Sequence, residues 1–380
     1  MTTAKTTSSK VKIFEGCNFF RQRLLLATLS GTPIRITKIR YEDDEPGLVE
    51  YETSFLNLVN KLTNGSKIEI NETGTQVLYV PGLLIGGEVE HDCSCQRSMG
   101  YYLEGVVPLA PFCKKTLTLT LKGVTNDKRD ISVDSIKFVT LALMKRFGVL
   151  GESLDLKINK RGAKPDGGGE VVFTCPATRK LKPINLVEPG KFKRIRGTAY
   201  CMKVAPSMAN RLVDASKKIL SQVLSDVFIY TDHAKGASSG NSPGFGLSLM
   251  VESTQGTMLC VDACSHARNE EGAVTAEDLG AACAYKLLQE IYRGGCVDAA
   301  HQSLALLYMA LGQMDVSKIM IGPLTTYTIQ FLRHMKEFFN ITYKIELARG
   351  GDDGEQVGGD ERYILTCVGI GYANFTKPSI

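Results

Sequence analysis

The sequence predicts an α/β (α+β) protein in which three βαβαββ-like repeats form a large domain and a smaller α/β domain is inserted. Two observations predict this fold. The order helix–strand–helix–strand–strand recurs three times along the 380 residues. Corresponding helices are unevenly spaced, because Phe55 to Ile136 spans 81 positions whereas Ile136 to Ile329 spans 193, which leaves a surplus of 112 residues. That surplus has helix and strand patterns of its own, as an inserted domain has.

The first repeat follows a polar tail (residues 1–10) that we expect to be disordered. Alternating apolar residues predict strands, and apolar residues three or four positions apart predict helices. The expected elements are a short strand from Val11, a helix over 20–29 that ends at Gly31, a strand over 34–39, a helix with Phe55, Leu58, Val59 and Leu62 on one face, and strands over 67–70 and 76–80.

The second and third repeats show the same order. The second has a helix over 98–110, a strand over 116–122, a helix from Ser132 with Ile136, Val139, Leu143 and Phe147 on one face, and strands over 153–159 and 169–175. The third has a helix over 299–311, a strand over 318–321, a helix over 327–339 that faces inward through Ile329, Leu332 and Met335, and strands over 343–347 and 363–368, joined by a Gly/Asp-rich loop (349–360) that we expect to be mobile.

The inserted domain is predicted over residues 184–294, so that residues 11–183 and 295–380 form the large domain. Its expected elements are strands over 195–202, 227–231, 247–252 and 258–262 and helices over 208–224 and 275–292.

Composition excludes several classes of protein. The 43% hydrophobic and 22% charged fractions are typical of a soluble globular chain, and the net charge of +5 is compatible with nucleic-acid binding. No apolar run reaches the roughly 18 residues needed to span a bilayer, and the N-terminus lacks the apolar core of a signal peptide. The 11 scattered cysteines predict reduced thiols in the cytosol or nucleus.

A basic, glycine-rich turn separates the last two strands of the second repeat. Gly167, Gly168 and Gly169 allow positive φ angles that turn backbone N–H groups toward one point, and Lys160, Arg161 and Lys164 surround it. This pattern fits either an anion or phosphate cradle or a long hairpin turn with a basic tip.

The motif Arg161-Gly-x-x-Pro165-x-Gly-Gly-Gly-x-Val171 resembles the signature of the RNA 3′-terminal phosphate cyclase family. The segments 15–21 and 239–244 resemble two further family motifs. The resemblance implies the fold described above. For an active member it also implies that AMP is joined to a catalytic histidine, passed to an RNA 3′-phosphate and released as a 2′,3′-cyclic end forms.

The chain departs from the family at the positions that carry this chemistry. The family's His-Leu-x-Thr-Asn stretch reads Pro323-Leu324-Thr325-Thr326-Tyr327, so a proline holds the nucleophile position. An Asp-Gln pair falls at Ser303-Leu304, Cys17 and Asn18 interrupt the N-terminal glycine run, and a basic loop is replaced by Glu42-Asp43-Asp44-Glu45. We therefore predict no catalytic residue, no metal and no cofactor.

The segments 312–318 and 366–372 resemble the cyclase-like, non-cyclase branch of the family, which acts in eukaryotic ribosome biogenesis. The resemblance implies a non-catalytic factor for small-subunit pre-rRNA processing in the nucleus and nucleolus. It would bridge a large nucleolar GTPase and pre-rRNA, together with small nucleolar RNP in the small-subunit processome, without contacting a membrane. The alternative is an RNA-processing enzyme, either a pre-rRNA endonuclease or a residual nucleotide-dependent RNA 3′-end activity.

Basic residues supply the remaining candidates for contacts with RNA or a partner. Residues 157–196 carry eleven Lys/Arg against three acids, and Lys191, Lys193 and Arg194 lie at the entrance to the insert. A solvated hinge is the alternative there. Arg333 and Lys336 lie with His334 on the predicted polar side of the last long helix, where a solvated face is the alternative.

His301 and the cysteines leave two further alternatives. His301 is the histidine nearest the lost Asp-Gln site, and as a replacement nucleophile it would need a rearranged site. Two clusters, 91–95 and Cys260…Cys264-Ser265-His266, contain metal-ligand types but lack a four-ligand spacing, so thiols without a metal are the favoured interpretation.

Overall fold

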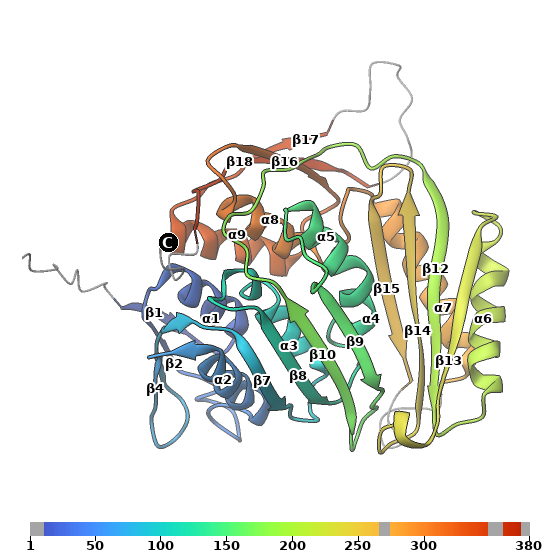
Figure 1. The fold of residues 1–380 in the computed structure, drawn as a ribbon, viewed down its shortest axis with the longest axis horizontal. Helices are drawn as coiled ribbons and strands as arrows, with labels where there is room; N and C mark the ends of the chain where they lie inside the picture. The colour runs from blue at the N-terminus through green and yellow to red at the C-terminus, as the bar shows by residue number, and fades with distance from the viewer. Residues whose placement is uncertain (1–10, 266–273, 349–359, 374–380) are drawn as a thin grey trace, which may run out of the picture.

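The computed structural model describes residues 11–265, 274–348 and 360–373. It is a mixed α/β protein with the predicted repeat architecture (Figure 1). The tail over 1–10 and nearly all of the 349–360 loop lie outside the described residues. Within them, no helix combines the length and the apolar character needed to cross a membrane.

The first repeat forms a sheet in the order β1-β2-β5-β4. β1 and β2 are parallel and joined through a helix, whereas β2, β5 and β4 pair antiparallel, because only a helical crossover lets successive strands run the same way. Its elements are β1 (Lys12–Glu15), α1 (Phe20–Ser30), β2 (Ile34–Thr37), α2 (Glu50–Leu62), β4 (Lys67–Ile70) and β5 (Val77–Val80), and a small ladder, β3 (Thr63–Asn64) with β6 (Leu83–Leu84), follows α2.

The second repeat has the same strand order, β7-β8-β10-β9. Its first strand was not among the expected elements, because it reads Gly-Glu-Val-Glu-His-Asp and is mostly polar. The elements are β7 (Gly87–Asp92), α3 (Met99–Val106), β8 (Leu117–Gly123), a composite helix, β9 (Asp155–Lys160) and β10 (Gly169–Cys175). The composite helix consists of α4 (Val133–Ser135), a π-helical turn, called the π-turn below (Ile136–Thr140), and α5 (Leu141–Arg146).

The third repeat is split by the insert. Its sheet runs β11-β16-β18-β17, and β11 (Asn185–Leu186) pairs in parallel with β16. This short strand lies inside the range expected for the insert, so the chain leaves the repeat after its first strand and returns at its first helix. The other elements are α8 (Gln302–Leu311), β16 (Val316–Ile321), α9 (Thr326–Phe339), β17 (Lys344–Leu347) and β18 (Tyr363–Val368).

The inserted segment forms its own sheet, in the order β13-β12-β14-β15. Both of its helices pack on one face, around a separate core that includes Ile195, Leu212, Leu249 and Leu287. Its elements are β12 (Phe192–Met202), α6 (Ser207–Leu220), β13 (Val227–Ala234), β14 (Gly244–Ser253), β15 (Met258–Cys264) and α7 (Ala276–Arg293). In Figure 1 this unit lies beside the second repeat, with β15 nearest to it.

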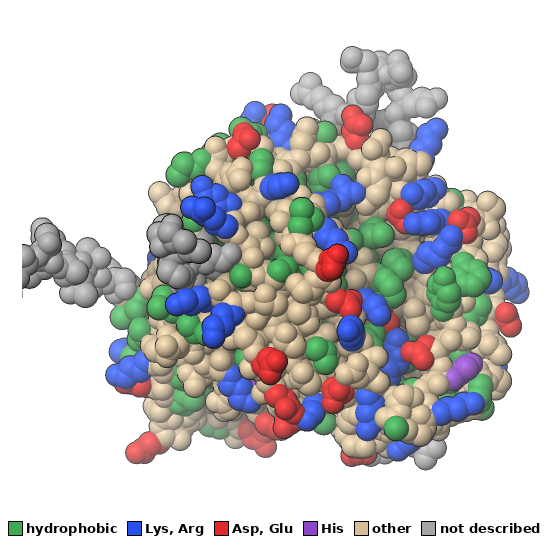
Figure 2. Space-filling view, viewed as in Figure 1, with side chains coloured by type: hydrophobic (Ala, Val, Ile, Leu, Met, Phe, Trp, Pro, Cys, Tyr) green, Lys and Arg blue, Asp and Glu red, His purple; other side chains and the backbone are tan. Residues whose placement is uncertain are grey.

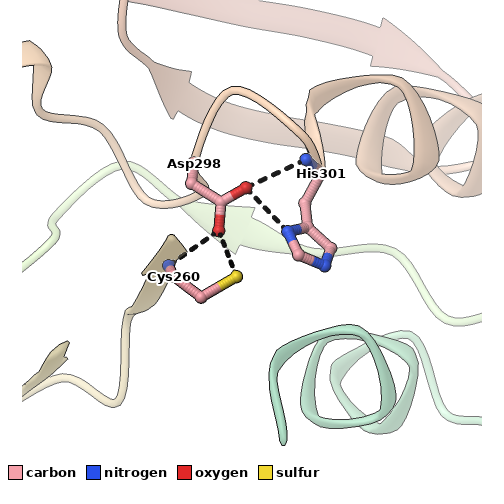
Figure 3. A group of neighbouring side chains, drawn as sticks. All are labelled: Cys260, Asp298 and His301. Atoms are coloured by element: carbon pink, nitrogen blue, oxygen red, sulfur yellow. Dashed lines mark hydrogen bonds and ion pairs between the residues drawn. The ribbon is translucent and has the colours of Figure 1, made fainter. Parts of the chain in front are cut away.

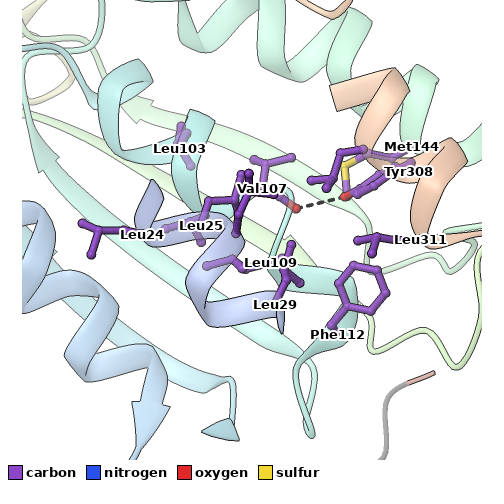
Figure 4. Packing of buried hydrophobic residues seen from close by; sticks show 14 of the residues in the cluster. Leu24, Leu25, Leu29, Leu103, Val107, Leu109, Phe112, Met144, Tyr308 and Leu311 are labelled. Carbon is purple, nitrogen blue, oxygen red and sulfur yellow. Dashed lines mark hydrogen bonds between the residues drawn. The ribbon is translucent and has the colours of Figure 1, made fainter. Parts of the chain in front are cut away.

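The three repeats together form the large unit, and the insert forms the second unit. The core of the large unit is built from helices of all three repeats. Leu24 of α1, Leu103 of α3 and Leu311 of α8 are buried in one continuous cluster, part of which is shown in Figure 4. α8 is apolar around its whole circumference, which requires burial on all sides. The hydroxyl of Tyr308 donates to the carbonyl oxygen of Val107 at 3.1 Å, so the polar end of this buried ring is satisfied.

The buried face of α9 differs from the predicted one. Ile329 is 40% exposed, whereas Thr328, Phe331, Met335 and Phe338 are buried. Phe338 stacks on Phe14 of β1 with ring centroids 5.8 Å apart, which joins the helix to the first repeat. Met335 is buried and Leu332 packs half-buried against the core, as predicted, so the expectation was wrong only for Ile329.

Candidate functional site

Pro323, at the expected nucleophile position, lies in the turn between β16 and α9. Its carbonyl oxygen accepts hydrogen bonds from the guanidinium of Arg293 and from Nε2 of Gln302, each at 3.1 Å. Oε1 of Gln302 accepts in turn from the hydroxyl of Thr328 at 2.9 Å. The hydroxyl of Thr325 caps α9 by accepting from the Thr328 amide at 3.1 Å. The polar groups around Pro323 are thus bound to one another.

Three arginines of the first two repeats are bound to carboxylates of the same chain, and one of them, Arg21, lies close to Tyr327 at the start of α9. Arg21 lies 2.8 Å from Glu104, and its guanidinium covers the ring of Tyr101. Burial opposes the charge of Arg21, but Glu104 outweighs it and raises the pKa further. The other two pairs are Arg40–Glu52, with both hydrogen bonds at 2.8 Å, and Arg97–Asp130. Little net positive charge is left here to hold a phosphate.

The acidic loop predicted to repel a terminal phosphate follows β2. All four of its residues, 42–45, are exposed. It adds negative charge to this end of the large unit, as expected from the sequence.

Arg161, a candidate for the predicted anion or phosphate cradle, is a buried bridge between the two units. Only 4% of the residue is exposed. Its two terminal nitrogens each donate to Asp134 at 2.8 Å, and Nε donates to Asp232 at 2.6 Å. The guanidinium also lies 4.4 Å from the ring centroid of Tyr200. Asp134 belongs to the second repeat, whereas Asp232 and Tyr200 belong to the insert, so one side chain joins both.

The triple glycine serves close packing against the insert. Gly167 has φ +56, and a Cβ there would lie 2.8 Å from the backbone of Gly123. Its amide donates to the carbonyl of Ala163 at 2.9 Å, and its own carbonyl accepts from the amide of Asn241 at the same distance. A Cβ on Gly168 would lie 2.7 Å from the side chain of Asn241. Gly169 starts β10. Packing of the loop 239–244 therefore explains these glycines without a bound anion.

The two lysines beside the glycine turn differ in their surroundings. Lys164 lies 3.2 Å from a carboxylate oxygen of Asp127 and lines a hollow at the junction of the two units. Lys160 is the last residue of β9, is half-buried, and pairs in register with Glu170.

The basic residues at the entrance to the insert lie on and before β12. Lys191 is exposed. Lys193 and Arg194 share one carboxylate, Glu252 of β14, at 2.8 Å and 2.5 Å. Two cations and one anion leave a net positive charge at the surface. The side chains of Lys193 and Arg194 are accessible to solvent, whereas that of Arg161 is buried.

Arg333 and Lys336 are exposed on α9, and the only contact of the Arg333 side chain within the described residues is a long one to Gln330, at 3.3 Å. His334, expected on the same polar side, is instead buried at 2% exposure. Its Nδ1 pairs with Oε1 of Gln22 at 3.0 Å. Burial, together with the charge of Arg23, lowers the pKa of His334 to about 4.

His301 belongs to a buried polar group at the junction of the units (Figure 3). Its Nδ1 lies 2.7 Å from Asp298, and its Nε2 lies 2.7 Å from the hydroxyl of Thr140. Asp298 also accepts from the amide and thiol of Cys260 in β15, at 3.0 and 3.4 Å. Burial disfavours a charged His301, but Asp298 outweighs burial and raises its pKa.

This buried polar group consists of residue types that can bind a metal or act as a nucleophile. Cys260, Asp298 and His301 are of metal-ligand types and lie close enough to share an ion. Each is nevertheless engaged in hydrogen bonds within the chain. Both nitrogens of His301 are bound, and only 2% of the residue is exposed, so a substrate has no route to a replacement nucleophile there.

Sequence reasoning missed the residues that dock the insert. Besides Asp134 and Asp232, they include Asp262 of β15, which accepts from the hydroxyls of Ser132 and Ser135 at 2.6 Å. Burial raises the pKa of Asp262. One signal was present in the sequence, since Asp134 is a charged residue at the start of an otherwise apolar helix. Its partners lie tens of residues away, so the pattern could not name them.

The chain matches a known protein family over most of its length. The family model described as RNA 3′-terminal phosphate cyclase matches residues 12–345. The chain belongs to the RNA 3′-terminal phosphate cyclase family. This match confirms the predicted family and fold class.

Curated relatives in the cyclase family cover nearly the whole chain. The RNA 3′-terminal phosphate cyclase-like protein of Homo sapiens is 57% identical over 364 residues, which are 96% of this chain and 97% of the human protein. A probable cyclase-like protein of Drosophila melanogaster is 51% identical over 370 residues, or 96% of each chain. The rRNA processing protein rcl1 of Schizosaccharomyces pombe is 43% identical over 375 residues, covering 98% of this chain and 99% of that protein. The predicted resemblance to the cyclase-like branch is confirmed.

Proposed function

We propose that this protein is a non-catalytic factor in rRNA processing, acting in the nucleus on the small-subunit precursor. The observation that carries the proposal is the near full-length similarity to proteins named cyclase-like, one of them an rRNA processing protein, combined with Pro323 where an active cyclase needs its histidine. A pyrrolidine ring offers no lone pair for attack on the α-phosphate of ATP.

The surroundings of Pro323 support the same proposal. Arg21, which lies close to Tyr327, is paired with Glu104, Arg40 and Arg97 are paired with Glu52 and Asp130, and the carbonyl of Pro323 is fixed by Gln302. Binding a triphosphate there would require breaking partly buried ion pairs, which costs several kcal/mol when a charge is left without a partner. Neutralised arginines fit a structural site better than a nucleotide site.

Adenylylation tests the catalytic half of the proposal. The full chain is incubated with ATP labelled at the α-phosphate and Mg²⁺, and covalent label is counted after denaturation, with an active cyclase of the family as positive control. We expect no label above background. Stoichiometric covalent AMP would refute the proposal, and its loss in a His301→Ala variant would name the nucleophile.

Depletion tests the biological half. We expect loss of this protein from cells that express it to cause accumulation of unprocessed small-subunit pre-rRNA, measured by hybridisation to precursor-specific probes. Re-expression of the chain with Arg293→Lys, which perturbs the turn at Pro323, should restore processing if that turn does no chemistry. Normal precursor levels after depletion would refute a role in rRNA processing.

The finer parts of the proposal concern place and partners. We propose a nucleolar location, and a bridge between a large nucleolar GTPase and pre-rRNA with small nucleolar RNP in the small-subunit processome. The exposed candidates for these contacts are Lys191, Lys193, Arg194, Arg333 and Lys336. Arg161 and the glycines act at the junction of the units instead.

Charge reversal tests this surface. Lys191, Lys193 and Arg194 are changed together to Glu, and the matched control reverses Lys67, Arg211 and Lys344, three exposed cations elsewhere. Both variants change the net charge equally. We expect the first to lose capture of pre-rRNA or of the GTPase, and the control to retain it. Equal capture by both would remove this surface from the proposal.

A further inference from the structure

The sheet of the insert has one covered face and one partly open face. α6 and α7 lie on the side of Ile195, Ala199 and Ile229. Side chains on the other side include, from β12 and β13 in register, Arg196 beside Phe228 and Thr198 beside Tyr230. The β15 end of this face is covered by the second repeat through α4, whereas Phe228 and Tyr230 on β13 remain exposed among the described residues.

Two aromatic side chains stand exposed at that open edge. Phe228 is 48% exposed and Tyr230 is 59% exposed, with ring centroids 4.6 Å apart. They lie two residues apart on one strand, so their side chains project from the same face. Their Cα atoms are about 7 Å apart along the strand, and the rings lean toward each other. Figure 2 shows hydrophobic side chains at the surface over β12 and β13, with Lys and Arg beside them. Two large aromatic rings exposed at adjacent positions form an apolar patch, which indicates a binding surface.

Positive charge borders these rings. The ammonium of Lys217 lies 5.9 Å from the ring centroid of Phe228. Arg196 is paired with Asp226 in the same region. Farther along β12, Lys193 and Arg194 share the single carboxylate of Glu252, which leaves one cation in excess.

A hollow continues this surface toward the second repeat. It is lined by Thr198, Ser248 and Met250 of the insert and by Phe138 of the π-turn. Phe138 is 37% exposed, and the ammonium of Lys137 lies 5.7 Å from its ring centroid. Aromatic and cationic groups therefore stand on both sides of a hollow that Asp134, Val139 and Leu249 also line.

We propose that the open face of the insert sheet binds single-stranded RNA, with bases stacked on Phe228 and Tyr230 and the phosphate backbone along Arg194 and Lys193. A four-stranded sheet with exposed aromatics on one face is a common base-stacking surface, since every base has a π-face and stacking needs no particular sequence. Cations beside the rings match the negative charge of the RNA backbone, whereas an apolar peptide would gain little from them. The inference rests on the proposed function in rRNA processing and names the surface that touches RNA.

Removal of the rings tests the inference. The full chain and its Phe228→Ala/Tyr230→Ala variant are titrated into a fluorescein-labelled, unstructured RNA of about 12 nucleotides, and binding is read by fluorescence anisotropy. The matched control is Tyr285→Ala/Tyr292→Ala, which removes two rings that are 62% and 56% exposed on α7, behind the sheet. We expect at least about tenfold weaker binding for the first variant, and no change for the control.

A second variant reports stacking directly. The chain contains no Trp, so Tyr230→Trp introduces a single indole at the proposed stacking position. We expect RNA to quench its fluorescence and to bind as tightly as it binds the natural chain, because an indole also stacks. The dependence of affinity on salt should be unchanged in Phe228→Ala/Tyr230→Ala and reduced in Lys193→Gln/Arg194→Gln, because only the latter removes phosphate contacts.

The outcomes separate this inference from the proposed function. Unchanged RNA affinity without the rings, or an unquenched indole, would overturn the stacking surface. The stacking surface would also be overturned if the ring-deficient variant kept its RNA affinity but no longer co-purified with a protein that binds the natural chain. That result would assign the face to protein docking. If the ring-deficient variant binds RNA normally but depletion still blocks pre-rRNA processing, the proposed function stands and this inference fails.

Discussion

Replacing Arg161 by Met would separate a structural from a ligand-binding role for the first residue of the family motif. If Arg161 holds the insert to the second repeat, the variant loses stability. If it binds phosphate, the variant keeps its stability and loses affinity for RNA. The contacts with Asp134 and Asp232 favour the first outcome.

The expected loss follows from the burial of the two carboxylates. The side chain of Asp134 is 1% exposed, so removal of Arg161 leaves a buried charge without its partner, which costs about 3–5 kcal/mol. The side chain of Asp232 is 46% exposed and returns to water, so it adds no more than about 1 kcal/mol. We therefore expect Arg161→Met to lower the free energy of unfolding by about 3–5 kcal/mol.

Urea unfolding followed by circular dichroism measures this loss, and Arg194→Met is the matched control. Arg194 also binds a carboxylate, but its side chain is 43% exposed, so the control should cost about 1 kcal/mol or less. Adding Asp134→Asn to Arg161→Met should recover part of the loss, because the buried charge is removed together with its partner.

The pH dependence has a defined sign. In the natural chain burial works against ionised Asp134, but Arg161 outweighs it and lowers the pKa, so this contribution is lost as pH falls through the lowered folded value. In Arg161→Met burial alone raises the pKa, so the difference between variant and natural chain should shrink as pH falls from 7 toward 4. A cost below about 1 kcal/mol, or a difference independent of pH, would refute the bridge.

Three further predictions follow from the described contacts. Gly167→Ala should lower the urea midpoint more than Gly236→Ala, because both have φ near +55 but only Gly167 faces backbone at 2.8 Å; equal midpoints would refute tight packing of the turn. Stability should fall as pH drops from about 6.5 toward 4, since the pKa of His334 is about 4 in the folded chain and near 6.5 when unfolded, and His334→Gln should flatten that slope in acid titrations. Glu104→Gln should cost about 1–3 kcal/mol in urea unfolding by leaving Arg21 short of its carboxylate, and an unchanged midpoint would show that the pair contributes nothing.

The repeats were predictable because their signals are local. Alternation and helical periodicity identified most helices and strands, as in α2 and β10. Local signals failed where burial was decided elsewhere. β7 carries two glutamates and forms a strand because β8 pairs with it, and Ile329 is exposed because Phe338 stacks on Phe14.

The site was only partly predictable for the same reason. The replacement at Pro323 and the acids of the 42–45 loop can be read directly from residue types. The fates of Arg161 and His334 cannot, because a basic residue in a motif looks the same whether its partner is a phosphate or a distant carboxylate. Likewise Lys193 and Arg194 were found as charges, but not the rings of Phe228 and Tyr230 beside them.

The sequence by itself determined the repeat order, the insertion and the presence of a proline at residue 323, because periodicity and side-chain type need no partner. Only the tertiary structure decided which charges are free to bind and which are used within the chain. Burial removes water from Arg161 and Asp134 and makes their pairing obligatory, whereas Lys193 and Arg194 remain solvated at the surface. That difference in solvation is set by segments far apart in the chain, and it separates a structural contact from the proposed site for RNA.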